Sequence, residues 1–472
     1  MVFSSIAFLI YFLPIFLLVY YLSPNKFKNY VVLIFSVFFY AWGAPKFVFI
    51  LLAITTASFY VVKWMDASSK RKHKRLLLTL SVVINLGLLA FFKYANFFVD
   101  NLNETFELLG YNAVAWTKIV LPIGISFYTF QTLTYSVDVF RGVHKPLDKL
   151  SNYVLYIIMF PQLIAGPIVR YNSIADQIVT RNETNNDRLL GFYRFSIGLA
   201  KKVFIANVMG AKADEILSMD FASMDSTTAW VGILAYTFQI YFDFSGYSDM
   251  AIGIGRMIGF KFPENFDNPY TSKSITEFWR RWHITLGAWM KNYLYIPLGG
   301  NKVSKRRLYF NLWFVFLLSG LWHGAAWNFV IWGAFHGFFL VIERLFLAKL
   351  LTKAGSVIAL GYTFFVTVMG WVIFRIEDYQ SAFVFYERLF SFEFASFDFF
   401  SDVQFLIFLL LAAFFSFFTL LPSGQKIQQK IFYTDYSKAG FIIGFAVAIL
   451  LVFLSVSSIA TSDFNPFIYF RF

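Results

Sequence analysis

The sequence of 472 residues contains no cysteine and few charged side chains. Without cysteine the chain cannot form disulfides, thiolate metal sites or a cysteine acyl-enzyme. Charged residues make up 14% of the chain and hydrophobic residues 58%, whereas a typical soluble domain is about 25% charged. This balance excludes a disordered chain, a coiled coil and a soluble multidomain enzyme, and it indicates a membrane protein.

Aromatic residues and positive charge are, by contrast, abundant. The 64 phenylalanines, 27 tyrosines and 12 tryptophans suit a surface that faces lipid, with tyrosine and tryptophan at the membrane interfaces. In a soluble protein the formal net charge of +13 would suggest a nucleic-acid partner, but here the positive-inside rule is the better explanation. We therefore expect the lipid bilayer as a partner and no nucleic acid.

Apolar segments recur along the whole chain and predict an all-α, polytopic membrane protein of about a dozen transmembrane and re-entrant helices. The first, residues 1–22, is expected to be a span and not a cleaved signal peptide. The others are residues 30–42, 47–65, 76–94, 116–137, 153–169, 192–208, 228–244, 310–322, 329–347, 357–374, 405–421 and 441–456. Since we find no repeat of fixed period, we expect a single domain over residues 1–472.

A basic run at residues 70–75 is the clearest topology mark, and the positive-inside rule places it in the cytoplasm. Counting crossings from this run puts Lys26, Lys28 and the loop near Arg141 on the same side, with the N-terminus outside. Farther along the chain, prolines and glycines interrupt the apolar runs. Such interruptions favour re-entrant pieces around an internal cavity.

The most polar interior stretch, residues 261–307, is too polar to cross a membrane as a bare helix. We expect it to lie at the cytoplasmic face, or to dip into it, as a re-entrant or amphipathic segment. Arg280, Arg281 and His283 lie there among tryptophans. They suit the phosphates of a soluble donor, or equally well the headgroups of anionic lipids. Glu277 can pair with Arg281 at a spacing of i,i+4.

Two of the five histidines, His323 and His336, lie inside apolar segments. His323 is about 24 Å of helix from Arg307 at the cytoplasmic edge, which places it past the middle of a core about 30 Å thick. A neutral imidazole there suits the removal of a proton from a hydroxyl, or it is a core histidine hydrogen-bonded between helices. His336 falls on a different helical face, so we do not expect the two histidines to share a metal.

Asp243 and Asp249 stand at the end of a predicted span and, at about 240° apart on a helix, are not a same-face catalytic pair. Helix capping or ion pairing with Arg256 is the simpler role for them. We find no G-x-S-x-G motif, no Walker A motif and no histidine pair at i,i+4 in the sequence. Histidine-assisted group transfer is therefore the leading chemistry, and we expect no metal site.

Five motifs in order resemble those of the membrane-bound O-acyltransferase (MBOAT) family, and within it the bacterial alginate O-acetyltransferase branch. They are residues 160–168, 243–249, 278–283, 293–300 and 319–324, and the likeness extends to residues 1–5 and 465–470. The resemblance implies a multi-pass enzyme of the cell inner membrane whose helices surround a central funnel and tunnel. It also maps the family's catalytic Leu-Trp-His-Gly histidine onto His323 and a second functional histidine onto His283.

The resemblance further implies O-acetyl transfer from a cytoplasmic donor, acetyl-CoA, toward hydroxyls of alginate, another exopolysaccharide or peptidoglycan outside the membrane. It implies a periplasmic partner of the SGNH-hydrolase type and no bound cofactor. The candidate substrate-binding residues are Arg280, Arg281, Trp322 and Asn268. Two alternatives remain open: a D-alanyl transferase of the same family, and a channel or flippase.

Overall fold

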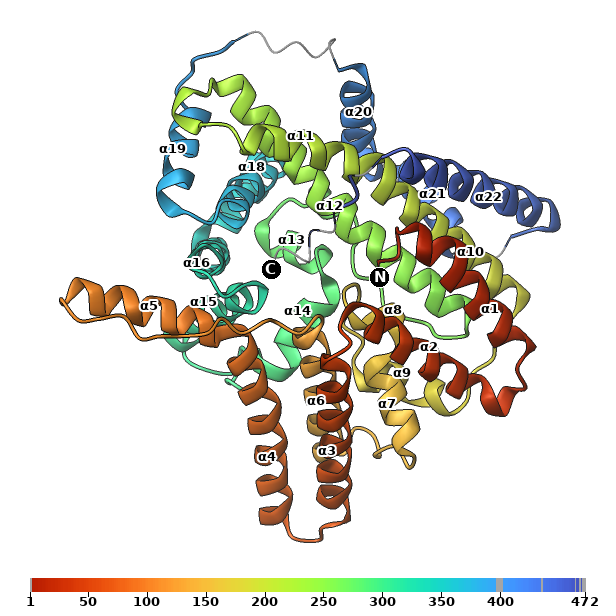
Figure 1. Cartoon of the computed structure of the whole chain (residues 1–472). Helices are drawn as coiled ribbons and strands as arrows, with labels where there is room; N and C mark the ends of the chain where they lie inside the picture. Colours follow the sequence, from red (N-terminus) through yellow and green to blue (C-terminus); the bar gives the residue numbers. More distant parts are fainter. Residues whose placement is uncertain (1, 396–401, 434–435, 463, 467, 469–472) are drawn as a thin grey trace. The chain divides into compact units, whose positions relative to one another are not determined.

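The structure, a computed structural model, describes residues 2–395, 402–433, 436–462, 464–466 and 468. Over these residues the chain folds into helices without any strand, which confirms the all-α prediction (Figure 1). Met1, Phe467, Tyr469 and Phe470, which belong to the motifs at the chain ends, lie outside the described residues. Two compact units are apparent, one of residues 7–183 with 258–263, the other of residues 2–6, 184–257 and 264–472. The single domain over residues 1–472 remains a prediction.

The first unit contains the helices of the N-terminal part of the chain. They are η1 (Ala7–Phe12), α1 (Leu13–Leu22), η2 (Asn25–Phe27), α2 (Lys28–Gly43), α3 (Phe47–Ala67), α4 (Arg71–Leu89), η3 (Ala90–Tyr94), α5 (Ala95–Leu108), α6 (Ile125–Phe140), α7 (Leu150–Ile158), α8 (Phe160–Leu163) and α9 (Tyr171–Val179). Buried hydroxyls join three of them. Ser81 of α4 lies 2.8 Å from the hydroxyl of Ser136 in α6, and Asn85 donates to Ser58 of α3 at 3.2 Å. Such polar contacts hold helices together where lipid weakens the hydrophobic drive.

The second unit contains the candidate site. Its helices are α10 (Asn185–Ala200), η4 (Lys201–Ala206), α11 (Asn207–Leu217), η5 (Phe221–Ser223), α12 (Ser226–Met257), η6 (Pro269–Thr271), α13 (Ile275–Arg281), α14 (Ile284–Met290), η7 (Lys291–Tyr295), α15 (Lys305–His323), α16 (Trp327–Ile342), η8 (Glu343–Leu347), α17 (Ala348–Ala354), α18 (Ser356–Arg375), α19 (Tyr379–Leu389), α20 (Val403–Phe417), η9 (Phe418–Leu420), α21 (Pro422–Tyr433) and α22 (Lys438–Ala460). The polar stretch that we expected not to cross as one helix is divided here into η6, α13, α14 and η7.

The sequence predicted that a span ends near Asp243 and Asp249. Helix α12 instead runs for 32 residues, from Ser226 to Met257, and contains both aspartates. Both carboxylates are buried inside the helix and paired. Asp243 binds Lys202 at 2.7 Å, while Asp249 binds Arg194 at 2.6 Å. The predicted roles in capping and in pairing with Arg256 are therefore wrong, because cations from the neighbouring α10 and η4 neutralise these carboxylates.

Six described helical segments are long and apolar enough to cross a membrane, as expected of a multi-pass protein. They are Phe47–Ala67, Arg71–Leu108, Trp327–Ala354, Ser356–Arg375, Val403–Leu420 and Lys438–Ala460. The segment predicted over residues 116–137 is helical only from Ile125 onward. Pro122 and Gly124 precede this helix, and Gly124 has a φ of 76°, which favours glycine. An added Cβ there would lie 2.6 Å from the carbonyl oxygen of Leu163.

Candidate active site

His283 stands at the bend between α13 and α14 with a φ of 44°, in the left-handed region. Asn268, another candidate residue, has a φ of 46°. Residues other than glycine seldom adopt this conformation, and those that do are concentrated at functional sites. The bend is fixed by a backbone hydrogen bond of 2.9 Å from the amide of Ile284 to the carbonyl of Asn265.

The same Asn265 sets the tautomer of His283. Its side-chain oxygen lies 3.0 Å from Nδ1 of His283 and accepts from the Thr285 hydroxyl at 2.8 Å, while its amide nitrogen donates to Ser248 at 3.1 Å. Since an amide oxygen only accepts, Nδ1 of His283 carries the hydrogen and Nε2 carries the lone pair. Burial, with a further contribution from His323, lowers the pKa of His283 well below its usual value. His283 is therefore a neutral imidazole with its lone pair on Nε2.

The two predicted catalytic histidines both lie close to Trp322. The ring centroids of His283 and Trp322 are 6.1 Å apart, and those of Trp322 and His323 are 5.0 Å apart. Both imidazoles are buried, His323 to 8% exposure at the end of α15 and His283 to 1%. The ring of His323 also contacts Trp332 and Phe374 edge-on, at 5.2 and 5.5 Å. The fold thus brings His283, Trp322 and His323 together.

His336 contacts Trp332, which also contacts His323. Its ring centroid is 5.0 Å from that of Trp332, and its side chain is fully buried. Gly370 leaves room for this imidazole, because an added Cβ would lie 2.7 Å from Nε2 of His336. The described residues include no cluster of three or more metal-ligating side chains.

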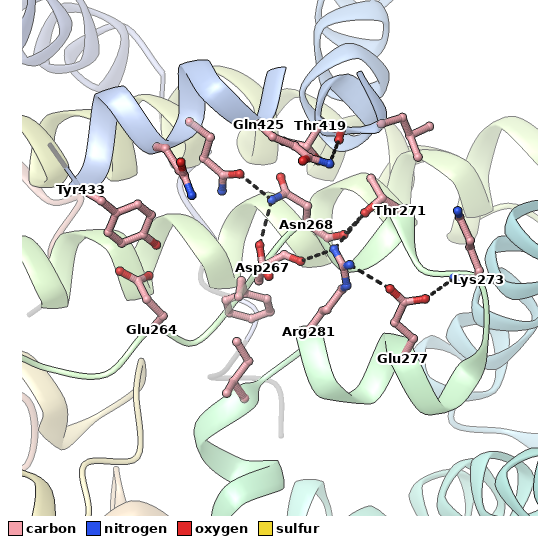
Figure 2. Close-up of a pocket in the computed structure, with 15 residues that line it drawn as sticks. Glu264, Asp267, Asn268, Thr271, Lys273, Glu277, Arg281, Thr419, Gln425 and Tyr433 are labelled. Atoms are coloured by element: carbon pink, nitrogen blue, oxygen red, sulfur yellow. Dashed lines mark hydrogen bonds and ion pairs between the residues drawn. The ribbon is translucent and has the colours of Figure 1, made fainter. Parts of the chain in front are cut away.

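A polar cavity of about 650 Å³ lies next to the His283 bend, because Arg281 and Ile284 both line it. Figure 2 shows Asn268, Arg281 and Glu277 on one side of it, with Gln425 and Thr419 across from them. Arg281 pairs with Glu277 at 2.8 Å, which confirms the predicted i,i+4 pair.

Two of the four predicted substrate-binding residues line this cavity and two do not. The Asn268 amide donates to Asp267 at 3.1 Å and to Gln428 of α21 at 2.9 Å, so it bridges the polar loop to α21. Asn268 and Arg281 line the cavity, whereas Trp322 does not and instead contacts both His283 and His323. Arg280 is exposed and does not line it.

Sequence reasoning missed Asn265 and also Glu343, a buried carboxylate in η8. Glu343 accepts hydrogen bonds from the backbone amides of Ile275 and Thr276, at 2.6 and 2.9 Å, and so holds the N-terminus of α13. No local pattern could reveal a partner so distant in the chain. The cap formed by Ser274, which accepts from the amide of Glu277 at 3.0 Å, did carry a local S-x-x-E signal.

Comparison of the sequence with known proteins identifies the family of this chain. Residues 34–376 match the model of the MBOAT, membrane-bound O-acyltransferase family. The chain is 47% identical over 395 residues to a protein of Pseudomonas aeruginosa named probable alginate O-acetylase AlgI, covering 83% of this chain and 75% of that protein. It is 37% identical over 418 residues to the peptidoglycan O-acetyltransferase of Helicobacter pylori, covering 81% and 78%.

A more distant similarity links the chain to the teichoic acid D-alanyltransferase of Streptococcus thermophilus. The two are 30% identical over 240 residues, which cover 48% of this chain and 58% of that protein. The family match spans most of the chain, and the helices that can cross a membrane agree with it. The chain belongs to the membrane-bound O-acyltransferase family and is a multi-pass membrane O-acyltransferase.

Proposed function

We propose that this enzyme transfers an acetyl group from a cytoplasmic acetyl-CoA donor toward hydroxyls of an extracytoplasmic polysaccharide, with His323 and His283 as its catalytic residues. The proposal rests first on the relatives, since those with the widest coverage are named as O-acetylating enzymes of alginate and of peptidoglycan. The observation that carries it is the placement of two buried imidazoles around Trp322.

In this proposal His323 takes the proton of the attacking hydroxyl, and the alkoxide oxygen then forms the new ester bond to the acetyl carbon while the thiolate of the donor leaves. Histidine is suited to this task because its ordinary pKa lies close to neutral pH, so an imidazole can both take and release a proton. His283 stays neutral, since two positive imidazoles this close would repel each other. A proton taken up by the pair is therefore held by one ring at a time.

On the donor side we assign the polar cavity to the polar part of acetyl-CoA. Arg281 and Lys273 are its two cationic side chains and Asn268 adds an amide, while Glu264, Asp267 and Glu277 are carboxylates of the same lining. Guanidinium and ammonium groups bind phosphate oxygens well, and the fork of arginine does so at two points. The carboxylate of Glu277 pairs with Arg281 and so orients the guanidinium group in the absence of the donor.

We assign the enzyme to the cell inner membrane and propose a periplasmic partner of the SGNH-hydrolase type that passes the acetyl group to alginate, another exopolysaccharide or peptidoglycan. The names of the relatives support a polysaccharide acceptor. The D-alanyltransferase likeness covers about half of the chain, which favours acetyl over D-alanyl as the cargo.

The test is a reconstitution in sealed proteoliposomes of known orientation, with acetyl-CoA labelled in the acetyl group supplied at the cytoplasmic face only. The proposal predicts labelled ester on an acceptor alcohol supplied at the other face, and no ester when acetyl-CoA is replaced by free acetate. Transfer of D-alanine from a carrier-protein thioester but not of acetyl would contradict it. Passage of a solute through the vesicles without any acyl transfer would instead indicate the channel or flippase.

A further inference from the structure

The helix that begins with α4 is longer than a membrane crossing. Its N-terminal Arg71 belongs to the basic run that the positive-inside rule assigns to the cytoplasm. This run ends at Arg75, and about 20 apolar residues, or roughly 30 Å of helix, are needed to cross a hydrocarbon core. A core that begins at Leu76 therefore ends near Tyr94. The helical segment Arg71–Leu108 continues beyond that point, so its second part lies past the outer boundary of the core.

That second part, α5, does not continue along the axis of α4. Figure 1 shows α5 running across the direction of α4 after the π-helical turn η3 (Ala90–Tyr94). Widened turns of this kind are a recognised cause of helix bends. If α4 crosses the bilayer, α5 lies along the membrane surface.

The sequence of α5 has the pattern of a surface helix. Phe98, Leu102 and Phe106 recur at i, i+4 and i+8 and so form one apolar stripe, which Leu109, the residue after the helix, extends. Phe98 is 67% exposed and Leu109 65% exposed in this chain. The acidic residues of the helix lie on the opposite face and comprise Asp100, Glu104 and Glu107.

An extended segment, residues 111–121, returns along α5 and is tied to it by two asparagines. Asn96 accepts from the indole of Trp116 at 3.0 Å and exchanges two hydrogen bonds with the backbone of Ile119, at 2.9 and 2.8 Å. Asn103 does the same with the backbone of Val114, at 2.7 and 3.2 Å. Exposed Tyr111 and the exposed ring of Trp116 belong to the residue types that concentrate at membrane interfaces.

We propose that α5 and its returning segment, residues 95–121, form an arm that lies in the outer interface of the bilayer. The apolar stripe then occupies the boundary between headgroups and acyl chains, while the acidic face meets water. The occupant of the apolar stripe is lipid. Continuity with a spanning helix supports this choice, because the arm emerges at the depth where that interface lies.

The absence of cysteine in the native sequence allows a direct test. Single variants Phe98→Cys and Leu109→Cys place a thiol on the apolar stripe, and the matched controls Asp100→Cys and Glu104→Cys place one on the acidic face. Each full-length variant is labelled with an environment-sensitive fluorophore and reconstituted in nanodiscs. Gel filtration and the helical circular dichroism signal serve as the folding check.

The proposal predicts blue-shifted emission at positions 98 and 109 that is quenched by nitroxide lipids and not by aqueous iodide. Positions 100 and 104 should show the reverse. In spheroplasts, a membrane-impermeant maleimide should label Asp100→Cys from outside. Iodide quenching at all four positions, or labelling of Asp100→Cys from the cytoplasmic side only, would overturn the proposal. Protection of position 98 only when a soluble protein is added would indicate a protein partner and would overturn it as well.

Discussion

The side-chain oxygen of Asn265 lies 3.0 Å from Nδ1 of His283, and this contact leaves Nε2 of a buried imidazole as a free base. Two conditions make that base available at neutral pH. Burial and the nearby His323 lower the pKa of His283, and the amide of Asn265 fixes the tautomer without adding charge. The surroundings of His283 at this bend therefore favour the uncharged form of its imidazole.

Replacing Asn265 with aspartate should move the acid limb of the pH–activity profile upward. A carboxylate against Nδ1 stabilises imidazolium, so His283 would be protonated at a higher pH, by about 1–3 units for an opposite charge at this distance. Activity would then be lost earlier as the pH falls. The measurement is kcat/KM against pH. Asn265→Ala, which removes the acceptor without adding a charge, should lower activity without this upward shift, and superimposable profiles for Asp and Asn would contradict the assignment.

Gly320→Ala should separate α15 from α16 and displace His323. An added Cβ at Gly320 would lie 2.1 Å from the carbonyl oxygen of Phe329 and 3.1 Å from Cα of Gly333. Overpacking of this kind costs about 1–3 kcal/mol of folding stability. Thermal unfolding in detergent should show the loss. Gly361→Ala is the matched control, because nothing lies within 4 Å of its added Cβ. Equal melting temperatures for the two variants would show that α15 and α16 tolerate separation.

Lys202→Leu should destabilise the second unit strongly. The Lys202–Asp243 pair is 3% and 2% exposed, and Asp243 also accepts from the amide of Ile468 at 2.8 Å. Removing one partner leaves a buried charge, at a cost of about 3–5 kcal/mol. The double variant with Asp243→Leu should recover much of that loss.

Denaturant or thermal unfolding checks this, with Lys118→Gln as the control. The Lys118–Asp100 pair is exposed at 77% and 52%, so its loss should change stability by no more than about 0.5 kcal/mol. A Lys202→Leu protein as stable as the control would show that the buried pair contributes nothing.

Arg281→Gln should weaken donor binding more than it slows chemistry. Arg281 lines the polar cavity, and a charge-assisted hydrogen bond contributes about 1.5–3 kcal/mol, or roughly 10- to 100-fold in KM. Steady-state kinetics with acetyl-CoA give the two constants. The neighbouring Arg280, exposed and outside the cavity, provides the matched control Arg280→Gln. A rise of KM in the Arg280 variant alone would move the donor site to the exposed surface.

Much of this site was accessible from local sequence. Apolar runs predicted the six helical segments that can cross a membrane, and the scarcity of imidazoles in apolar segments drew attention to His323 and His336. The i,i+4 spacing found the Glu277–Arg281 pair because that contact depends only on helix geometry. These features share one property: each depends on residues within a few turns of one another.

Contacts between distant residues were not accessible. The length of α12 depends on Lys202 and Arg194, which neutralise its two carboxylates from other helices. The tautomer of His283 depends on Asn265 across a loop, and the N-terminus of α13 depends on Glu343. Residues 116–124, predicted as the start of a helix, are not helical: Asn96 binds Trp116 and the backbone of Ile119 there, and Gly124 with its positive φ precedes α6.

The most direct test of the central claim is acetyl transfer by His323→Ala and His323→Gln proteins that insert and fold as the native chain does. His73→Ala is the matched control, because this histidine is exposed at the start of α4. Loss of a positioned general base predicts a fall in kcat of about 10²- to 10⁴-fold in both His323 variants, with native activity in His73→Ala. Native kcat in a folded His323→Ala protein would contradict the account.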